Sequence, residues 1–175
     1  MRPPKGRTWA RRGCTPVVRV TAAISPRVSV AALLAIGPRQ RPRLIYRTLR
    51  PRRDRRRKGF SEADYAALID AAHQQLGGPI VLVWDNLNTH VSAAIVQMVA
   101  ARPWLTVFRL PPYAPELNPV ERVWAHLKRS LANLTKHTIA ELTALVKTRL
   151  RRMQYRPGLL VGFLASTGLD LGSFL

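Results

Sequence analysis

The stretch that decides the fold is residues 79–90, which read Pro79-Ile80-Val81-Leu82-Val83-Trp84-Asp85-Asn86-Leu87-Asn88-Thr89-His90. Its first half is an unbroken apolar run, which predicts a short strand over residues 80–84. An unbroken run, rather than an alternating one, is typical of a sheet that is covered on both faces. Asp85 follows the strand at once, so its carboxylate is expected at the end of a rigid element.

The sequence on either side of this strand predicts alternating strands and helices. Short apolar runs separated by Pro and Gly predict neighbouring antiparallel strands over residues 16–21, 27–36 and 43–49. A capping-box sequence at Ser61 and the pair Gly77-Gly78 bound a helical pattern between them. Further patterns predict a helix over 92–101, a strand over 105–110, and helices over 119–134 and 139–153. This order predicts an α/β fold with a mixed sheet flanked by helices.

The length of 175 residues suffices for one domain with its own core. We expect that domain to span residues 1–156 and to be followed by a C-terminal tail, residues 157–175. The tail is apolar, but glycines and Asp170 interrupt it too often for a membrane span. The single cysteine, Cys14, excludes an internal disulfide and a cysteine-rich zinc site. No signal-peptide pattern is visible, so a cytoplasmic setting is expected.

The chain is strongly basic, with a formal net charge of +20. Residues 1–58 hold 18 of the 29 Lys and Arg residues and one acid, Asp54. This charge favours a nucleic-acid partner. The alternative is a solubilising arm, although the basic residues interleave with strand-like apolar runs. Candidate phosphate contacts are Arg7, Arg11, Arg12, Arg43, Arg47, Lys128 and Arg129. For Lys128 and Arg129, an ordinary solvated position on a helix is an equal alternative.

A second carboxylate, Glu121, lies 36 positions after Asp85 in the segment Pro111-Pro112-Tyr113-Ala114-Pro115-Glu116-Leu117-Asn118-Pro119-Val120-Glu121-Arg122-Val123-Trp124. Two carboxylates on rigid elements could hold Mg²⁺, which prefers oxygen ligands, and divalent ions can drive phosphodiester chemistry. Simpler roles exist for both residues. Asp85 could cap a turn or helix, and Glu121 could complete a capping box that begins at Asn118.

Both segments closely resemble the mariner-like DDE transposases of bacterial insertion sequences. In that family the second acid ends a strand in a Trp/Leu-Asp-Asn…His motif, here Trp84, Asp85, Asn86 and His90. The third acid lies in a Pro-rich motif that ends Asn-Pro-Ile/Val-Glu, here Asn118 to Glu121. About 35 residues separate the two acids in the family, and residues 86–120 number 35 here. The resemblance extends from about Pro3 to Leu169.

The resemblance implies an RNase H-like fold that cleaves and transfers DNA strands with Mg²⁺ or Mn²⁺. Asp85 and Glu121 would be the second and third catalytic acids and metal ligands, and Asn86, His90 and Asn118 would lie beside them. His90 could equally be a surface residue at a helix start. The implied partners are transposon ends and target DNA, with no membrane, and two copies could pair in a transposition complex.

The first acid of the implied triad has no counterpart. In the family it occurs shortly before a segment like Pro3 to Ala10, and only Met1 and Arg2 precede that segment here. Asp54 lies in a charge run and is a poor substitute. We therefore expect the first strand of the sheet to be missing, and the chain alone to be a poor or inactive nuclease. The main competing hypothesis is a non-enzymatic basic DNA-binding protein. A third hypothesis is another RNase H-like nuclease, which the sequence of residues 111–124 disfavours.

Overall fold

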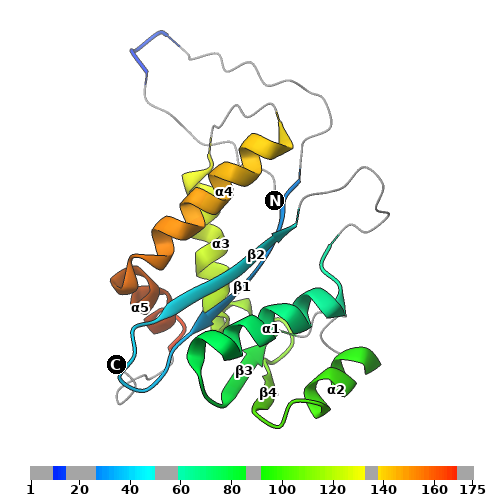
Figure 1. The fold of residues 1–175 in the computed structure, drawn as a ribbon. Helices are drawn as coiled ribbons and strands as arrows, with labels where there is room; N and C mark the ends of the chain where they lie inside the picture. Colours follow the sequence, from blue (N-terminus) through cyan, green and yellow to red (C-terminus); the bar gives the residue numbers. More distant parts are fainter. Residues whose placement is uncertain (1–9, 15–26, 50–58, 86–91, 133–137, 169–175) are drawn as a thin grey trace.

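The structure is a computed structural model that describes residues 10–14, 27–49, 59–85, 92–132 and 138–168. Within these ranges, strands and helices alternate as the sequence predicts, and Figure 1 shows helices on both sides of the longer strand pair. The predicted strand over 16–21 and the charge run at 50–58 lie outside the described residues.

The longer strand pair joins β1 (Ser29–Ala35) to β2 (Arg43–Leu49) in antiparallel register, with Ser29 opposite Leu49. Both faces are covered. Leu44 packs with α3, α4 and α5, whereas its neighbour Ile45 packs with α1 on the other face. Because successive side chains point to opposite faces, coverage of both faces explains why these strands carry apolar residues at consecutive positions.

The second strand pair is parallel and joins β3 (Ile80–Trp84) to β4 (Leu105–Arg109), with α2 (Ala93–Ala100) as the crossover helix. Leu82 and Trp84 are buried in a cluster with α1 and α2. Val81 and Val83, which alternate with them, are 66% and 55% exposed. The prediction that β3 is covered on both faces is therefore wrong for the described residues, which cover one face only.

Helix α1 (Glu62–Leu76) begins and ends where the sequence predicts. The Ser61 hydroxyl accepts a hydrogen bond from the Asp64 amide, and the Asp64 carboxylate accepts one from the Ser61 amide, which completes a capping box. The helix ends at Gly77, whose φ of 71° is in the left-handed region that glycine adopts without strain. Leu68 and Ala72 of this helix pack on the β1–β2 sheet.

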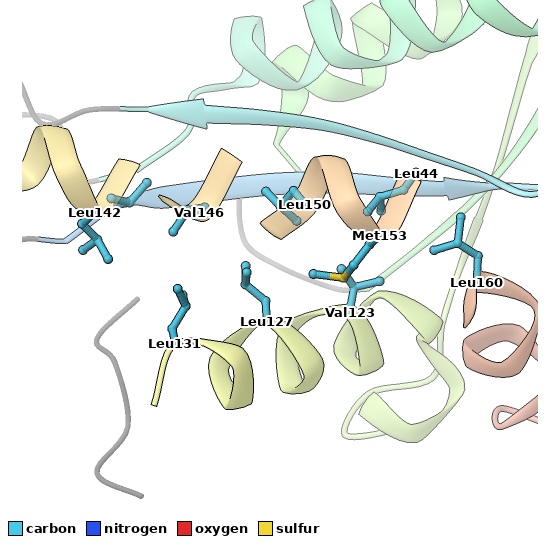
Figure 2. Close-up of a cluster of buried hydrophobic side chains, with 10 residues drawn as sticks. Leu44, Val123, Leu127, Leu131, Leu142, Val146, Leu150, Met153 and Leu160 are labelled. Atoms are coloured by element: carbon cyan, nitrogen blue, oxygen red, sulfur yellow. The ribbon is translucent and has the colours of Figure 1, made fainter. Parts of the chain in front are cut away.

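The largest core cluster lies between α3 (Pro119–Ser130), α4 (Ile139–Gln154) and the β1–β2 sheet. Figure 2 shows Val123, Leu127 and Leu131 in a row that faces side chains of α4. The facing residues on α4 are Leu142, Val146, Leu150 and Met153. Both rows recur at the three- and four-residue spacing of one helix face, so the amphipathic pattern of the sequence determines which faces meet.

A further helix, α5 (Pro157–Ala165), occupies the first half of the stretch expected as a tail. Leu160 is fully buried in the main core and Leu164 is 3% exposed, while Gly158 and Gly162 face solvent. Burial of one apolar edge compensates for two glycines that would otherwise weaken a helix. A domain boundary at residue 156 remains a prediction, but α5 packs on the domain it was expected to follow. No helix of the described residues could cross a membrane.

Candidate active site groove

Asp85 and Glu121 line one groove, which has a volume of about 500 Å³. The groove runs between β1 and β3. Its lining includes Val30 to Leu34 of β1, Ile80 to Asp85, residues of α1 and the start of α3. Among the described residues that line it, only Asp85 and Glu121 are charged. The structure therefore brings the two predicted acids to the same hollow, although 36 positions separate them.

Asp85 directly follows the last residue of β3. Parallel pairing with β4 holds that strand end, since Trp84 lies opposite Arg109 and the Trp84 carbonyl accepts a hydrogen bond of 2.9 Å from the Leu110 amide. The Asp85 side chain is exposed to the groove and solvent. A carboxylate at such a strand end is held by a rigid element.

Glu121 lies in the first turn of α3, and Asn118 and Pro119 determine where that helix starts. The Asn118 side-chain oxygen accepts from the Val120 amide at 3.1 Å, and Pro119 takes the first helical position, where its missing N–H costs nothing. The Glu121 amide donates to the Asn118 carbonyl at 3.0 Å. Asn118 also lines the groove.

The geometry argues against a capping role for the Glu121 side chain. In a capping box this carboxylate would accept from the Asn118 amide. The Asn118 amide instead donates to the Pro115 carbonyl at 3.1 Å, within the short 3₁₀ turn η2 (Pro115–Leu117). The Glu121 side chain is exposed. Its carboxylate is thus left for another use.

The loop between β4 and α3 contains a strained residue. Tyr113 has a φ of 59°, in the left-handed region that a bulky side chain rarely adopts, and its ring is fully exposed. The sequence motif contains this tyrosine but gave no indication of its conformation.

The predicted phosphate-binding residues lie on several elements. Lys128 and Arg129 are exposed in the last turn of α3, outside the groove lining. Arg43 and Arg47 are exposed on β2, and Arg11 and Arg12 are exposed before Cys14. Arg43 also donates to the Gln75 carbonyl at 2.7 Å, a structural contact with the end of α1 that the sequence did not reveal. Arg7, Asn86 and His90 lie outside the described residues.

A second, more polar hollow lies beside Arg47. It is lined by Tyr46, Arg47, Gln75, Lys147 and Gln154, among others. Burial raises the pKa of the Tyr46 hydroxyl, and the nearby positive charge of Arg151 acts in the opposite direction. The Tyr46 hydroxyl donates to the Lys147 carbonyl at 3.3 Å, so this tyrosine joins β2 to α4.

Comparison with known proteins identifies the family of the chain. A family model described as DDE superfamily endonuclease matches residues 1–145. The chain belongs to this family. The match includes β3, Asp85, the Pro-rich loop and Glu121, and it ends within α4. No curated protein matches the chain.

Solved structures show the same fold as this DDE superfamily member. A Mos1 transposase paired-end complex with the left transposon end aligns with 99% of the chain, at a TM-score of 0.60 and 16% identity. A Mos1 mariner paired-end complex with Mn aligns with 97% of it, at a TM-score of 0.60 and 16% identity. These likenesses confirm the predicted RNase H-like α/β fold. The chain spans about half of each Mos1 chain, 53% and 52%.

The groove acids are chemically suited to a divalent metal of the Mg²⁺ type. Carboxylate oxygens are hard ligands, and Mg²⁺ is usually held by one or two of them, with water and phosphate oxygens completing its shell. Within the described residues no three His, Cys, Asp or Glu side chains gather. Asp85 and Glu121 are oxygen ligands of the kind that such an ion accepts.

Proposed function

We propose that this chain is the catalytic part of a transposase, which cleaves and joins DNA with a divalent metal held by Asp85 and Glu121. One observation carries the proposal: both acids line the same groove, one at a strand end and one in the first turn of a helix. Membership in the DDE superfamily endonuclease family supports the reaction class. The Mos1 complexes, whose names specify a transposon end and Mn, support the substrate and the metal.

The acids, the helix cap and the basic residues would have different roles. Asp85 and Glu121 would supply metal ligands, and Asn118 would hold the helix start that positions Glu121. Bound Mg²⁺ or Mn²⁺ would supply charge neutralisation at the phosphate and a more acidic bound water. Exposed basic residues such as Lys128 and Arg129 would bind the DNA backbone, which fixes the position of DNA without reading its sequence. Two copies of the chain would pair on the transposon ends.

Metal binding tests the two acids directly. We expect Mn²⁺, followed by electron paramagnetic resonance of the free ion, to bind the chain, and Asp85→Asn or Glu121→Gln to weaken binding about tenfold or more. Glu116→Gln is the matched control, because Glu116 is an exposed acid in the same loop but lies outside the groove lining. Equal Mn²⁺ affinity in all four proteins would overturn the assignment.

Nicking of supercoiled plasmid tests the reaction. The described residues supply two acids, so we expect slow Mn²⁺-dependent nicking, which Asp85→Asn and Glu121→Gln abolish and Glu116→Gln retains. DNA binding that is unaffected by metal and by both substitutions, without any nicking, would instead identify a non-enzymatic basic DNA-binding protein.

A further inference from the structure

Tyr113 combines a strained backbone with a side chain that packing does not explain. Its φ of 59° lies in the left-handed region, which glycine adopts without strain and a bulky residue rarely adopts. Its ring is fully exposed, so no side chain of the described residues covers it. Such strain lowers stability and persists where the surrounding structure imposes it, most often at functional sites. An aromatic ring at this position therefore requires a reason other than folding.

The chain geometry keeps Tyr113 close to the two acids. The Leu110 amide donates to the Trp84 carbonyl at 2.9 Å, and Asp85 follows Trp84 directly. Leu110 lines the groove, and so do residues 117–121, which end at Glu121. Because consecutive Cα atoms lie about 3.8 Å apart, the Cα atom of Tyr113 is at most about 11 Å from that of Leu110. One strand of DNA rises by about 3.4 Å per nucleotide, so the ring can reach DNA within about three nucleotides of a phosphate at the groove.

The loop around Tyr113 is stiff and carries no positive charge. Pro111, Pro112 and Pro115 have φ angles that their rings fix, and η2 begins at Pro115. Residues 110–121 contain two acids and no Lys or Arg. The whole chain, with its net charge of +20, can attract DNA, but this loop cannot attract backbone phosphates by charge. What the loop offers to DNA is the flat face of the Tyr113 ring.

An unpaired base is the part of DNA that suits such a ring. Inside a duplex the faces of the bases stack on one another, so a protein side chain does not reach them unless the base leaves the stack. Unpaired bases present a free face, and aromatic side chains bind them by stacking, with little dependence on which base it is. A ring that a stiff loop already holds outward loses little conformational freedom when it stacks. Stacking uses the face of the ring and does not require the hydroxyl.

We propose that Tyr113 stacks on an unpaired base of the DNA strand that lies at Asp85 and Glu121. The proposal rests on the function proposed above, which brings a DNA phosphate to these two acids. Glycine would fit the left-handed backbone better but has no ring to stack, which accounts for a tyrosine at a strained position. A base held by Tyr113 would stay out of the duplex close to the bond that is cleaved.

Fluorescence anisotropy with two labelled DNAs tests the stacking. One is a duplex with a few unpaired nucleotides at a 3′ end, the other is fully paired, and both are titrated without metal so that cleavage does not alter them. We expect Tyr113→Ala to weaken binding of the unpaired end about tenfold or more and to leave binding of the paired duplex within about twofold. Tyr113→Phe should bind both DNAs as the unmodified chain does. Tyr155→Ala is the matched control and should change neither affinity, because Tyr155 is 74% exposed but is not among the residues that line the groove.

A glycine variant separates the contact with DNA from the effect on folding. Tyr113→Gly relieves the strained φ, so its Tm should equal or exceed that of the unmodified chain, while its binding of the unpaired end should fall as in Tyr113→Ala. Equal binding of the unpaired end by the unmodified chain and Tyr113→Ala, or equal losses with both DNAs, would overturn the proposal. A loss in Tyr113→Phe as large as in Tyr113→Ala would also overturn it. So would a doubled mass of the DNA-free chain in light scattering that Tyr113→Ala abolishes, because a second copy would then be the partner of the ring.

Failure of this proposal can be told apart from failure of the proposed function. The DNA titration contains no metal, whereas the Mn²⁺ measurements on Asp85→Asn and Glu121→Gln contain no DNA. Unchanged DNA binding in Tyr113→Ala would overturn the stacking and leave the metal ligands standing. Equal Mn²⁺ affinity in the two acid variants would overturn the metal site, and the effect of Tyr113→Ala on the unpaired end would still be measured.

Discussion

Asp70 of α1 and Arg102, which follows α2, form a two-pronged ion pair. Arg102 Nε donates to Asp70 Oδ1 and Arg102 Nη2 donates to Oδ2, each at 2.7 Å. Arg102 Nη1 also donates to the Met98 carbonyl at 2.8 Å, which fixes the guanidinium against the end of α2. Parallel double hydrogen bonds of this kind are the strongest form of an Arg–carboxylate pair. This pair therefore ties the crossover helix of the β3–β4 unit to α1.

We expect Asp70→Asn to lower the free energy of unfolding by about 1 kcal/mol at neutral pH, a small value because the Asp70 side chain is 42% exposed and solvent screens the pair. The hydrogen bonds from Arg102 are the main cause that lowers the pKa of Asp70. The positive charges of Arg102 and His73 act in the same direction. A lowered pKa in the folded state stabilises the protein above the unfolded value, about 3.9, and this stabilisation is lost as pH falls through the folded pKa.

Urea unfolding of both proteins across pH checks this prediction. The difference between them should be constant from about pH 5 to pH 7 and should shrink below about pH 4. A difference that grew on acidification would contradict the pairing.

Part of this fold could be predicted because local signals coincide with it. Ser61 and Gly77 bound α1 as their chemistry predicts, and the apolar runs of β1 and β2 pair as neighbours. The Asp70–Arg102 pair could not be predicted, since its members lie 32 positions apart and no pattern links them. Helix α5 was missed because two glycines in a short apolar stretch give little periodicity. The proline at its first position was the available signal.

The site was predictable for a different reason. The positions of Asp85 and Glu121 at a strand end and a helix start alone favoured ordinary caps. The resemblance of the surrounding motifs predicted that the two acids share one site, and both line the same groove. The motifs could not show that the Asn118 amide donates its hydrogen bond within η2. Because that amide is already bonded, Glu121 has no capping role. The motifs also could not show that Val81 and Val83 are exposed, because exposure depends on which elements cover the strand.

Helix α5 should contribute to stability as part of the main core. Leu160→Ala removes a side chain with no exposed surface, so we expect the free energy of unfolding to fall by about 2–5 kcal/mol. Tyr155→Ala, at a side chain that is 74% exposed just before α5, should change it by about 0.5 kcal/mol or less. Equilibrium denaturation measures both. Equal, small effects would show that α5 behaves as a tail.

The Asn118 cap should matter for both stability and metal binding. Asn118→Ala removes the acceptor for the Val120 amide and should cost about 1 kcal/mol of unfolding free energy. If Asn118 also positions Glu121, Mn²⁺ affinity should fall severalfold. Ser92→Ala is the matched control, because Ser92 caps α2 by accepting from the Ile95 amide and is not among the residues that line the groove. It should cost comparable stability and leave Mn²⁺ affinity unchanged. Similar losses of Mn²⁺ affinity in both variants would show that the loss in Asn118→Ala results from general destabilisation and not from the position of Glu121.

DNA binding should depend steeply on salt, and the slope should report individual phosphate contacts. Each phosphate neutralised by Lys or Arg contributes about 0.9 to the slope of log affinity against log salt concentration for duplex DNA. Lys128 and Arg129 are exposed on the helix that carries Glu121. They also lie in the last turn of that helix, where a positive charge interacts favourably with the helix dipole.

A role in the helix alone predicts that the double variant Lys128→Gln/Arg129→Gln lowers the free energy of unfolding by about 1 kcal/mol or less and leaves the salt slope unchanged. Phosphate contact predicts that the double variant reduces the slope by about 2. Fluorescence anisotropy on a duplex between about 50 and 200 mM salt decides between them. Arg39→Gln, at an exposed residue between β1 and β2, shows how much of any change follows from net charge alone. A flat salt dependence of the unmodified chain would refute the basic DNA-binding surface as a whole.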